Sequence, residues 1–427
     1  MVSHYKDKKV TVVGLARSGI AACNLLKDLG AEVFATDSAN SHAVKAQAEE
    51  LKKRGISVET GSHTIGFIRD KDLLVVSPGV NYSSQALLWA SEFKIPVISE
   101  IELAWSLCPA TVVAITGTNG KTTVTTLVAK VLEASGRKAL ALGNIGKPFS
   151  QEVMSLHNDD FVSLEVSSFQ LEKISRFKPK ASLILNFTPD HLDRYSTIQD
   201  YLDAKKRIFM NQDAHDYAVL NYDDPVVRVL AKEIKARVIF FGRQHTHYDA
   251  VLNLNPNHLA VMAVAEAFEV PREICYEVFR NFRGVEHRLE LVRTIDTIDF
   301  INDSKATNVD STIWALHNTM KPAILIAGGR DKKSDYKAIA DLVKQKVRLL
   351  VVIGEAKEKI SASFNGLLPI MKVSSLEEAV RVSFHKAQSG DCILFSPMCA
   401  SFDMFKDYEH RGRVFKEIVN KLIVNSS

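Results

Sequence analysis

Residues 114–123, AITGTNGKTT, constrain the fold of this chain more than any other stretch. The apolar run at 111–115 predicts a buried strand, and residues 124–134 continue with apolar side chains at helical spacing. A tight glycine loop between a strand and a helix gathers backbone N–H groups at a helix N-terminus, and together these form an anion site. Lys121 would reach the outer phosphates of a nucleotide, and the Thr122 hydroxyl would ligate the accompanying magnesium ion.

The loop is a shorter variant of the general phosphate-binding motif, because Ile115 stands where that motif has a glycine five residues before Gly120. The strand–loop–helix context nevertheless favours ATP binding over an incidental glycine turn. The residues expected to contact ATP here are Gly117, Thr118, Asn119, Gly120, Lys121, Thr122 and Thr123.

The composition is that of an ordinary globular protein, and the length suggests about two or three domains. A net charge of +4 over 427 residues is too weak to indicate nucleic-acid binding. No apolar run approaches the ~18 residues of a membrane span, and the polar N-terminus is unlike a signal peptide. Five scattered cysteines without a CxxC pair indicate free thiols in a reducing compartment. We therefore expect a cytoplasmic protein that binds neither nucleic acid nor membrane.

The first hundred residues open with a strand–helix–strand pattern. A strand at 10–13 leads into the loop 14–19 and a helix, and a second strand at 33–36 ends at Asp37. This pattern invites a dinucleotide interpretation, but Ala16 replaces the middle glycine of the usual fingerprint. The sequence thus predicts a Rossmann-like domain whose loop receives some nucleotide or phosphate, and it argues against NAD.

Another loop, Ser77-Pro78-Gly79, follows an apolar strand at 73–76. Open α/β sheets bind ligands at the carboxyl ends of their strands, so this loop is a second candidate for ligand contact, although a plain turn is equally compatible with it. The strand near 97–99 closes the first domain, which places the predicted boundary near Glu100.

Glu165 lies within the apolar strand 161–166. A carboxylate there is costly unless it is paired or bound to a metal ion. Magnesium fits, since it is usually held by one or two carboxylates together with substrate phosphates. A structural ion pair is the alternative.

Two further segments rich in charged residues follow in the central part of the chain. Residues 190–194, DHLDR, come after a strand and form either a site or a solvated loop. Residues 196–210 predict a helix with a capping box, and its Lys205-Lys206-Arg207 run would ordinarily indicate a solvated face.

The last third of the chain alternates strands with helices, which predicts a second mostly parallel sheet. Polar loops follow its strands at 303–308, 328–332 and 396–397, so this part is also expected to contribute ligand contacts. Residues 282–288 read as the linker into it.

Eight motifs occur in one order along nearly the whole chain: GTNGKTT, GNIG, LEVSSFQLE, DHLDR, HRLE, INDSKATN, GGRDK and SPMCASFDMFKDYEHRG. In this order the chain resembles the Mur ligases of bacterial cell-wall synthesis. The resemblance implies an α/β fold with three domains. These are a UDP-sugar-binding Rossmann-like domain over 1–99, a central ATP-binding P-loop domain with a mostly parallel sheet over 100–284, and a C-terminal amino-acid-binding Rossmann-like domain over 285–427.

The resemblance also implies an activity. The C-terminal motifs agree best with the family members that join D-glutamate to UDP-N-acetylmuramoyl-L-alanine, using ATP, through an acyl phosphate and a tetrahedral intermediate. The expected cofactors are ATP and two magnesium ions, the partners are the small-molecule substrates, and the protein is expected to be a monomer. Rival interpretations are a sibling ligase adding another amino acid, a folylpolyglutamate-type ligase, a NAD-dependent dehydrogenase and a non-catalytic ATP-binding switch.

The matching motifs carry residue roles over from the family. The catalytic residues implied are Lys121, His191, Lys205, Arg288 and Lys305. Metal ligands would be Thr122, Glu165, His191 and a carbamylated Lys205, and Arg288 and Asp303 would join the loop in binding ATP. The UDP substrate would contact Arg17, Ser18, Asp37, Gly79, Asn144 and His191. D-Glutamate would contact Thr307, Lys332, Ser401, Phe402 and Tyr408.

One segment departs from the family pattern. Before the last helix of their central domain, Mur ligases usually carry a longer stretch that ends in a His-Asn motif near the adenine, whereas this chain has only NLNPNH at 253–258. The histidines around it, His245, His247 and His258, lack metal-ligand spacing and are interpreted as surface residues.

Overall fold

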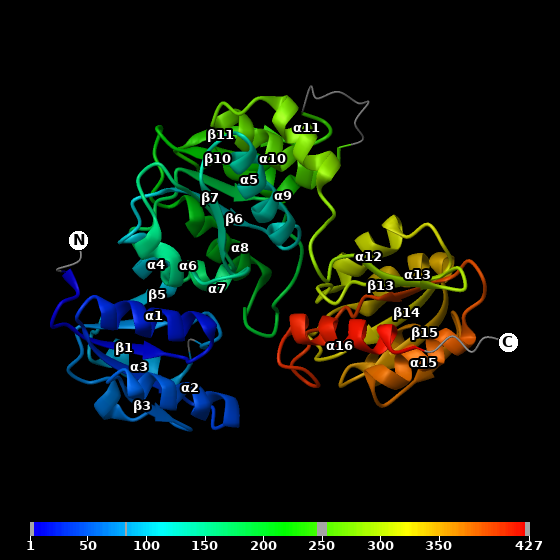
Figure 1. The fold of residues 1–427 in the computed structure, drawn as a ribbon, viewed down its shortest axis with the longest axis horizontal. Coiled ribbons are helices and arrows are strands. Elements are labelled where there is room, and N and C mark those ends of the chain that lie inside the picture. The colour runs from blue at the N-terminus through cyan, green and yellow to red at the C-terminus, as the bar shows by residue number, and fades with distance from the viewer. Residues whose placement is uncertain (1–3, 82, 246–253, 423–427) are drawn as a thin grey trace. The chain divides into compact units, whose positions relative to one another are not determined.

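The structure is a computed structural model that describes residues 4–81, 83–245 and 254–422. The chain forms two compact units (Figure 1). The first unit comprises Met1–Phe187 and Gln199–Phe282, and the second comprises Thr188–Ile198 and Arg283–Ser427. The segment at 188–198 therefore belongs with the C-terminal part of the chain, although the chain on both sides of it belongs to the first unit.

The N-terminal sheet of the first unit has five parallel strands in the order β3-β2-β1-β4-β5. The order reverses beside β1, and at such a point a doubly wound sheet opens a crevice for ligands. The strands are β1 (Lys9–Val13), β2 (Glu32–Asp37), β3 (Ser57–Thr60), β4 (Leu73–Val76) and β5 (Val97–Ser99). The helices are α1 (Arg17–Asp28), α2 (His42–Lys53) and α3 (Gln85–Glu92).

The second sheet of this unit has six parallel strands in the order β11-β10-β9-β6-β8-β7. The strands are β6 (Thr111–Thr116), β7 (Ala139–Gly143), β8 (Phe161–Glu165), β9 (Ala181–Ile184), β10 (Tyr217–Asn221) and β11 (Arg237–Phe241). The helices are α4 (Glu100–Trp105), α5 (Lys121–Ala134), α6 (Phe149–Glu152), α7 (Ser168–Leu171), α8 (Ile198–Lys206), α9 (Pro225–Val229), α10 (Pro256–Ala267) and α11 (Arg272–Asn281).

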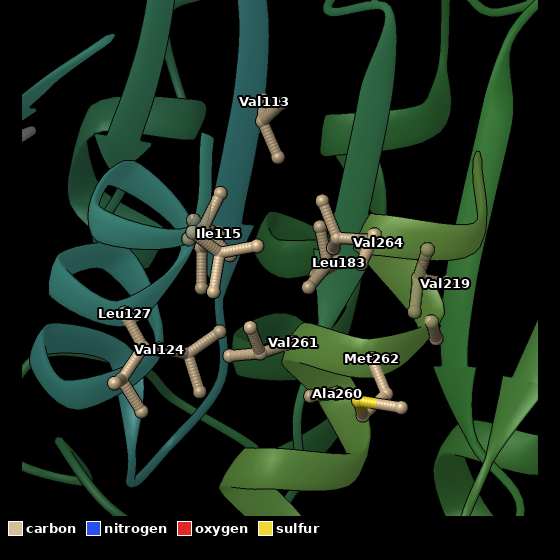
Figure 2. Close-up of a cluster of buried hydrophobic side chains, with 14 of the residues drawn as sticks. Val113, Ile115, Val124, Leu127, Leu183, Val219, Ala260, Val261, Met262 and Val264 are labelled. Atoms are coloured by element: carbon tan, nitrogen blue, oxygen red, sulfur yellow. The ribbon is translucent and has the colours of Figure 1, made fainter. Parts of the chain in front are cut away.

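The core of this sheet lies where α5 and α10 cover β6, β9 and β10 (Figure 2). Val113 and Ile115 of β6 and Val124 of α5 are fully buried there, as is Val261 of α10. Burying a side chain of this size contributes about 1.5–3 kcal/mol. This packing fixes β6 and α5, the strand and the helix that are joined by the loop at 117–120.

The second unit contains a six-stranded sheet in the order β12-β13-β17-β14-β15-β16, in which only the β12–β13 pair is antiparallel. The strands are β12 (Glu290–Ile295), β13 (Ile298–Asn302), β14 (Ala323–Gly328), β15 (Val347–Ile353), β16 (Ile370–Lys372) and β17 (Cys392–Phe395). The helices are α12 (Val309–Asn318), α13 (Ala340–Lys346), α14 (Lys357–Ser363), α15 (Leu376–Lys386) and α16 (Tyr408–Asn420). The expected fold class, α/β with mostly parallel sheets, is confirmed.

The hairpin that joins β12 to β13 was not foreseen from the sequence. Asp296 and Thr297 form its turn with φ values of +48° and +67°. Two consecutive left-handed residues define the turn that suits a two-residue hairpin, but its usual sequence signal is Asn-Gly or Asp-Gly, and Asp-Thr lacks that glycine.

A close approach in the N-terminal sheet gives a test of the fold. A Cβ added at Gly19 of α1 would lie 1.8 Å from the Gly14 carbonyl oxygen. We therefore expect Gly19→Ala to lower the free energy of unfolding by about 2–4 kcal/mol, because backbone must move to admit the methyl group. Gly66→Ala is the control, since nothing lies within 4 Å of its added Cβ. Urea unfolding of both variants measures the difference, and equal stabilities would contradict the packing described.

Candidate functional site

The phosphate-binding loop follows β6 and begins α5, as predicted. Gly117 and Gly120 have φ values of +149° and +85°, which only glycine adopts without strain. Asn186, which follows β9, holds the loop from the side. Its carbonyl accepts from the Thr118 N–H (3.1 Å), and its amide accepts from the Asn119 N–H and donates to the Asn119 carbonyl (2.8 and 3.0 Å). The loop is therefore fixed by the neighbouring strand as well as by its own glycines.

Lys121 is the first residue of α5, and its side chain turns back over the loop. The ammonium group donates to the Gly117 and Thr118 carbonyls, both at 2.8 Å. Thr123 lies in the same first turn and is half-buried. A cation and a helix N-terminus thus meet at one place, which is the arrangement that favours an anion.

Thr122 and Glu165 come together beside the loop, as the sequence predicted. Glu165 ends β8 with only 2% of its surface exposed. One of its carboxylate oxygens accepts from the Thr122 hydroxyl (2.7 Å), and the other accepts from the Asn144 amide (2.9 Å). The buried carboxylate and hydroxyl fit magnesium, which binds hard oxygen ligands. Asn144, expected to contact the UDP substrate, is hydrogen-bonded to Glu165 in this structure.

Lys205 of α8 is buried, with 1% of its surface exposed. Its ammonium group donates to the Gly117 carbonyl (2.9 Å) and lies 4.5 Å from the centroid of the Tyr201 ring. The expectation of a solvated face for the run Lys205-Lys206-Arg207 is therefore wrong at Lys205. Lys206, the next residue, instead pairs with Glu233 at 2.6 Å.

In the N-terminal sheet, the predicted UDP contacts gather at the carboxyl ends of β1 and β2. Asp37 accepts from the backbone N–H groups of Leu15 and Ala39 (2.7 and 2.8 Å), so its carboxylate shapes the loop after β1. Arg17 and Ser18 begin α1, and the Arg17 guanidinium donates to the Gly146 carbonyl. Gly79 follows β4 at the same edge, with nothing within 4 Å of an added Cβ.

His191 and Asp190 belong to the second unit, because they lie in the segment at 188–198. Asp190 pairs with Lys332 (3.3 Å), accepts from the Asn308 amide (3.0 Å) and lies 3.6 Å from the His191 ring. Although burial opposes ionisation, Lys332, His191 and Asn308 together hold the pKa of Asp190 well below its usual range. Lys332, expected to bind an acidic amino acid, thus has a carboxylate partner in this structure.

Arg288 of the linker and Asp303, which follows β13, were each expected to contact ATP, and in this structure they form an ion pair with a nitrogen–oxygen separation of 3.9 Å. Asp303 is fully buried and accepts from the Ser396 hydroxyl (2.8 Å) and the Leu289 N–H (3.2 Å). Burial raises the pKa of Asp303 to about 6, and the Arg288 charge and these hydrogen bonds only partly offset that rise.

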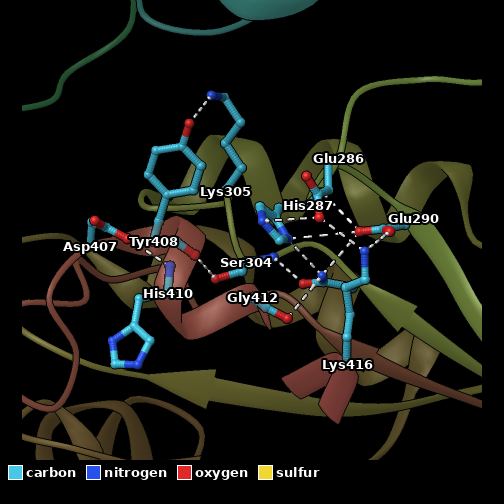
Figure 3. Close-up of polar contacts among 11 residues, drawn as sticks. Glu286, His287, Glu290, Ser304, Lys305, Asp407, Tyr408, His410, Gly412 and Lys416 are labelled. Carbon is cyan, nitrogen blue, oxygen red and sulfur yellow. Dashed lines mark hydrogen bonds and ion pairs between the residues drawn. The ribbon is translucent and has the colours of Figure 1, made fainter. Parts of the chain in front are cut away.

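Lys305 and Tyr408 meet directly (Figure 3). The ammonium group donates to the Tyr408 hydroxyl at 2.6 Å and lies 4.3 Å from the ring centroid. Thr307 follows on the same loop and is half-buried. Among the other expected D-glutamate contacts, Ser401 is buried and Phe402 is 62% exposed.

Arg411 is a residue that the sequence reasoning did not single out. Its guanidinium is buried and donates to the Ser304 hydroxyl and carbonyl (3.1 and 2.8 Å) and to the Cys399 carbonyl (3.1 Å). It therefore joins the loop that carries Lys305 to the loop that carries Ser401. Arg411 lies within the motif at 396–412, but its local sequence gives no sign that its side chain is buried.

The linker before Arg288 is anchored by a polar cluster (Figure 3). Glu286, His287 and Glu290 present ligand-type atoms within 4.8 Å of one another. Lys416 supplies the cation, since its ammonium group pairs with both carboxylates at 3.0 and 2.6 Å. A Cβ at Gly412 would lie 2.3 Å from the His287 ring, so only glycine fits against it.

The segment that departs from the family pattern falls partly outside the described residues, which exclude 246–253 and with them His247 and Asn253. Asn257 places its side-chain oxygen 2.5 Å from where a Gly120 Cβ would lie, so this asparagine, which the sequence reasoning missed, adjoins the phosphate loop. The surface interpretation is wrong for His258, which is half-buried and stacks on Phe279 at 4.3 Å. His245 is exposed, as expected.

These features define an α/β protein with a glycine loop at a helix N-terminus, an arrangement suited to an anion, and a buried carboxylate beside that loop. The chain matches three family descriptions: "Mur ligase MurD-like, N-terminal domain" over 8–99, "Mur ligase middle domain" over 115–284, and "Mur ligase, glutamate ligase domain" over 287–399. It is 42% identical to the UDP-N-acetylmuramoylalanine–D-glutamate ligase of Koribacter versatilis, with 98% of each chain covered. The enzyme of that name from Caldicellulosiruptor bescii is also 42% identical, over 98% of each chain. The chain belongs to the Mur ligase family.

Solved structures agree on the fold. The UDP-N-acetylmuramate–alanine ligase MurC of Thermotoga maritima matches with a TM-score of 0.62 at 19% identity, covering 97% of this chain and 99% of that one. MurF of Acinetobacter baumannii matches with a TM-score of 0.59 at 14% identity, covering 99% and 92%. Among the described residues, no helix combines the length and apolar character that crossing a membrane requires.

The raised pKa of Asp303 gives a test of its burial. Protonated Asp303 favours the folded state, so its contribution to stability is present below pH 3.8, the unfolded value, and is lost as pH rises through about 6. Asp303→Asn cannot titrate. As pH rises from 4 to 7.5, the parent loses this stabilisation and the variant does not. We therefore expect the free energy of unfolding of the variant, relative to that of the parent, to increase by about 1–3 kcal/mol over this range. Urea unfolding at both pH values checks this, with the exposed Asp341→Asn as the control. A difference that does not change with pH would contradict the burial.

Proposed function

We propose that this chain is a UDP-N-acetylmuramoylalanine–D-glutamate ligase that acts in the cytoplasm as a monomer. The observation that carries the proposal is its 42% identity to relatives of that name over 98% of both chains. The activity would supply peptidoglycan precursors, and thereby serve cell-wall biogenesis, cell shape and cell division.

The chemistry joins a carboxylate to an amine. A carboxylate is a poor electrophile, so ATP first converts it to an acyl phosphate, which the amine of D-glutamate attacks to give a tetrahedral intermediate and then an amide. Phosphoryl transfer of this kind depends on positioning and on neutralising charge. We assign that role to Lys121 at the outer phosphates, to Arg288 with Asp303 at the nucleotide, and to Lys305 at the acyl phosphate.

Two magnesium ions are proposed to be held by Thr122, Glu165, His191 and Lys205. The ions would neutralise the charge of the phosphates. The hydrogen bond between the buried Thr122 and Glu165 supports this assignment, because both groups then present oxygen atoms at one point beside the loop.

We propose that Lys205 is carbamylated, as the family resemblance implies, and the charges around the loop support this proposal. Lys121 and Lys205 both donate to the Gly117 carbonyl, so two ammonium groups lie near one oxygen atom, and burial leaves Lys205 little water. Once the Lys205 ammonium group has lost a proton, its neutral amine could add carbon dioxide and release a second proton. The product is a carbamate, so one of the two cations would be replaced by an anion that can bind magnesium.

The substrate contacts remain as the family motifs imply. Arg17, Ser18, Asp37, Gly79, Asn144 and His191 are assigned to the UDP substrate. Thr307, Lys332, Ser401, Phe402 and Tyr408 are assigned to D-glutamate. The pair between Lys332 and Asp190 supports this second assignment, since it demonstrates that a carboxylate fits beside this ammonium group. The proposed domains are 1–99, 100–284 and 285–427, each with its own sheet.

Phosphate release tests the function. With ATP, magnesium and UDP-N-acetylmuramoyl-L-alanine, we expect release when D-glutamate is supplied and none with L-alanine, L-lysine or meso-diaminopimelate. Lys121→Ala should lower the rate at least ~100-fold, because a charge on the transferred phosphate loses its partner. The exposed Lys130→Ala, on the same helix, is the control. Turnover with another amino acid would move the assignment to a sibling ligase.

Carbamylation can be observed directly. After incubation with ¹³C-bicarbonate and magnesium, the protein should give a carbamate carbon signal in its NMR spectrum, and Lys205→Arg should abolish it. An identical signal in the variant, or none in the parent, would refute the modification.

A further inference from the structure

A cavity of about 1030 Å³ lies in the first unit, away from the residues assigned above. Lys8, Asp72 and Pro96 line it at the points where β1, β4 and β5 begin. Because these strands are parallel, this is the amino edge of the N-terminal sheet, whereas Asp37 and the loops after β1 and β4 lie at its carboxyl edge. The opposite wall comes from α4 and from the loop that carries Arg176. The cavity is therefore distinct from the proposed UDP contacts.

The wall around Arg176 is well fixed. The buried Glu102 carboxylate of α4 accepts from the backbone N–H groups of Ser175, Arg176 and Phe177 at 2.7–2.9 Å. Trp105, one turn further along α4, packs its ring edge-on against Phe177, with centroids 6.2 Å apart. The position of the loop backbone and that of the indole are thus both set by contacts that do not use the cavity.

The two carboxylates that line the cavity, Glu102 and Asp72, are already engaged by donors of the protein. Both Glu102 oxygens receive the backbone hydrogen bonds just described. Asp72 accepts from the Lys9 N–H (2.8 Å) and pairs with Lys8 (3.5 Å). The Ser106 hydroxyl donates to the Leu103 carbonyl (2.7 Å), so the Tyr5 hydroxyl must donate in its contact with Ser106.

The donors, in contrast, retain unused capacity. Within the described part of the chain, neither the Arg176 guanidinium nor the Trp105 indole N–H donates a hydrogen bond to protein, and both residues line the cavity. Burial raises the pKa of Tyr5 and the Arg176 charge opposes that rise, which agrees with a guanidinium close to the ring. A site whose carboxylates are engaged, and whose guanidinium and indole N–H are available, favours an anion.

We propose that this cavity binds a small planar anion: an aromatic ring system that carries a carboxylate, sulfonate or phosphate. Arg176 would pair with the anionic group, Trp105 would donate a hydrogen bond to it, and Tyr5, Val10 and Ile98 would pack against the ring. The volume is at the upper end of that of small-molecule sites. The site does not depend on the proposed ligase activity, since none of these residues is assigned to it.

Titration with 8-anilinonaphthalene-1-sulfonate tests the site, because this probe joins an anion to fused rings and fluoresces when bound. The full chain is used with ADP, magnesium and UDP present, so that nucleotide-binding positions are occupied. We expect one bound probe per chain, with energy transfer from tryptophan. Arg176→Gln should weaken binding about tenfold, as loss of a charge-assisted hydrogen bond implies.

Two further variants make the result decisive. Trp105→Phe keeps the packing against Phe177 and removes the N–H, so it should weaken binding and reduce the energy transfer. Arg280→Gln makes the same charge change on the exposed face of α11 and should bind as the parent does. Thermal unfolding confirms that each variant is folded. Equal affinity in the Arg176→Gln, Arg280→Gln and parent proteins would overturn the proposal.

Discussion

Two ammonium groups near one backbone oxygen are the constraint on which the proposed active site depends. Lys121 from α5 and Lys205 from α8 reach the Gly117 carbonyl at 2.8 and 2.9 Å, and Lys205 is almost fully buried. Because both ammonium groups contact the same oxygen atom, the two positive charges lie close together and repel each other. The poor hydration of a buried group makes this repulsion stronger. A polyphosphate bound at the loop, or a change of charge on one amine, would relieve it. The loop is thus charged in a way that strongly favours an anionic ligand.

The rest of the first unit keeps these charges in place. Buried apolar side chains on β6, α5 and α10 fix the strand and the helix on either side of the loop (Figure 2). Asn186 fixes the loop itself, and Glu165 brings a negative charge to the end of the neighbouring strand. Because the backbone is held independently of any ligand, binding energy need not be spent on ordering it, and this favours precise phosphoryl transfer.

Much of the fold could be predicted from the sequence because it follows from local patterns. Apolar runs of four to six residues followed by glycine loops gave β1, β4 and β6, and helical spacing gave α5 and α15. The β12–β13 hairpin was not predicted, because its Asp296-Thr297 turn lacks the glycine that usually indicates a two-residue hairpin turn. The grouping of 188–198 with the C-terminal unit could not be predicted either, because it depends on distant residues such as Asn308 and Lys332.

The candidate site likewise contains residues that could be predicted from the sequence and residues that could not. Lys121, Thr122 and Glu165 could be found because their chemistry is unusual for their local context, and the structure places the last two in direct contact. Asn257, Asn186 and Arg411 could not, because an asparagine or arginine in a loop or helix carries no local sign of what it will contact. The burial of Lys205 could not be predicted either, because the residue stands in a run of basic residues that ordinarily indicates a solvated face.

The most direct measurement is a crystal structure grown with ADP and Mn²⁺, a metal whose anomalous scattering identifies it. The account predicts an anomalous peak beside the Thr122 hydroxyl and the Glu165 carboxylate, with the Lys121 ammonium group moved from the Gly117 carbonyl to a phosphate oxygen. A nucleotide bound elsewhere, or bound here with Lys121 still on the Gly117 carbonyl and no metal near Glu165, would contradict it.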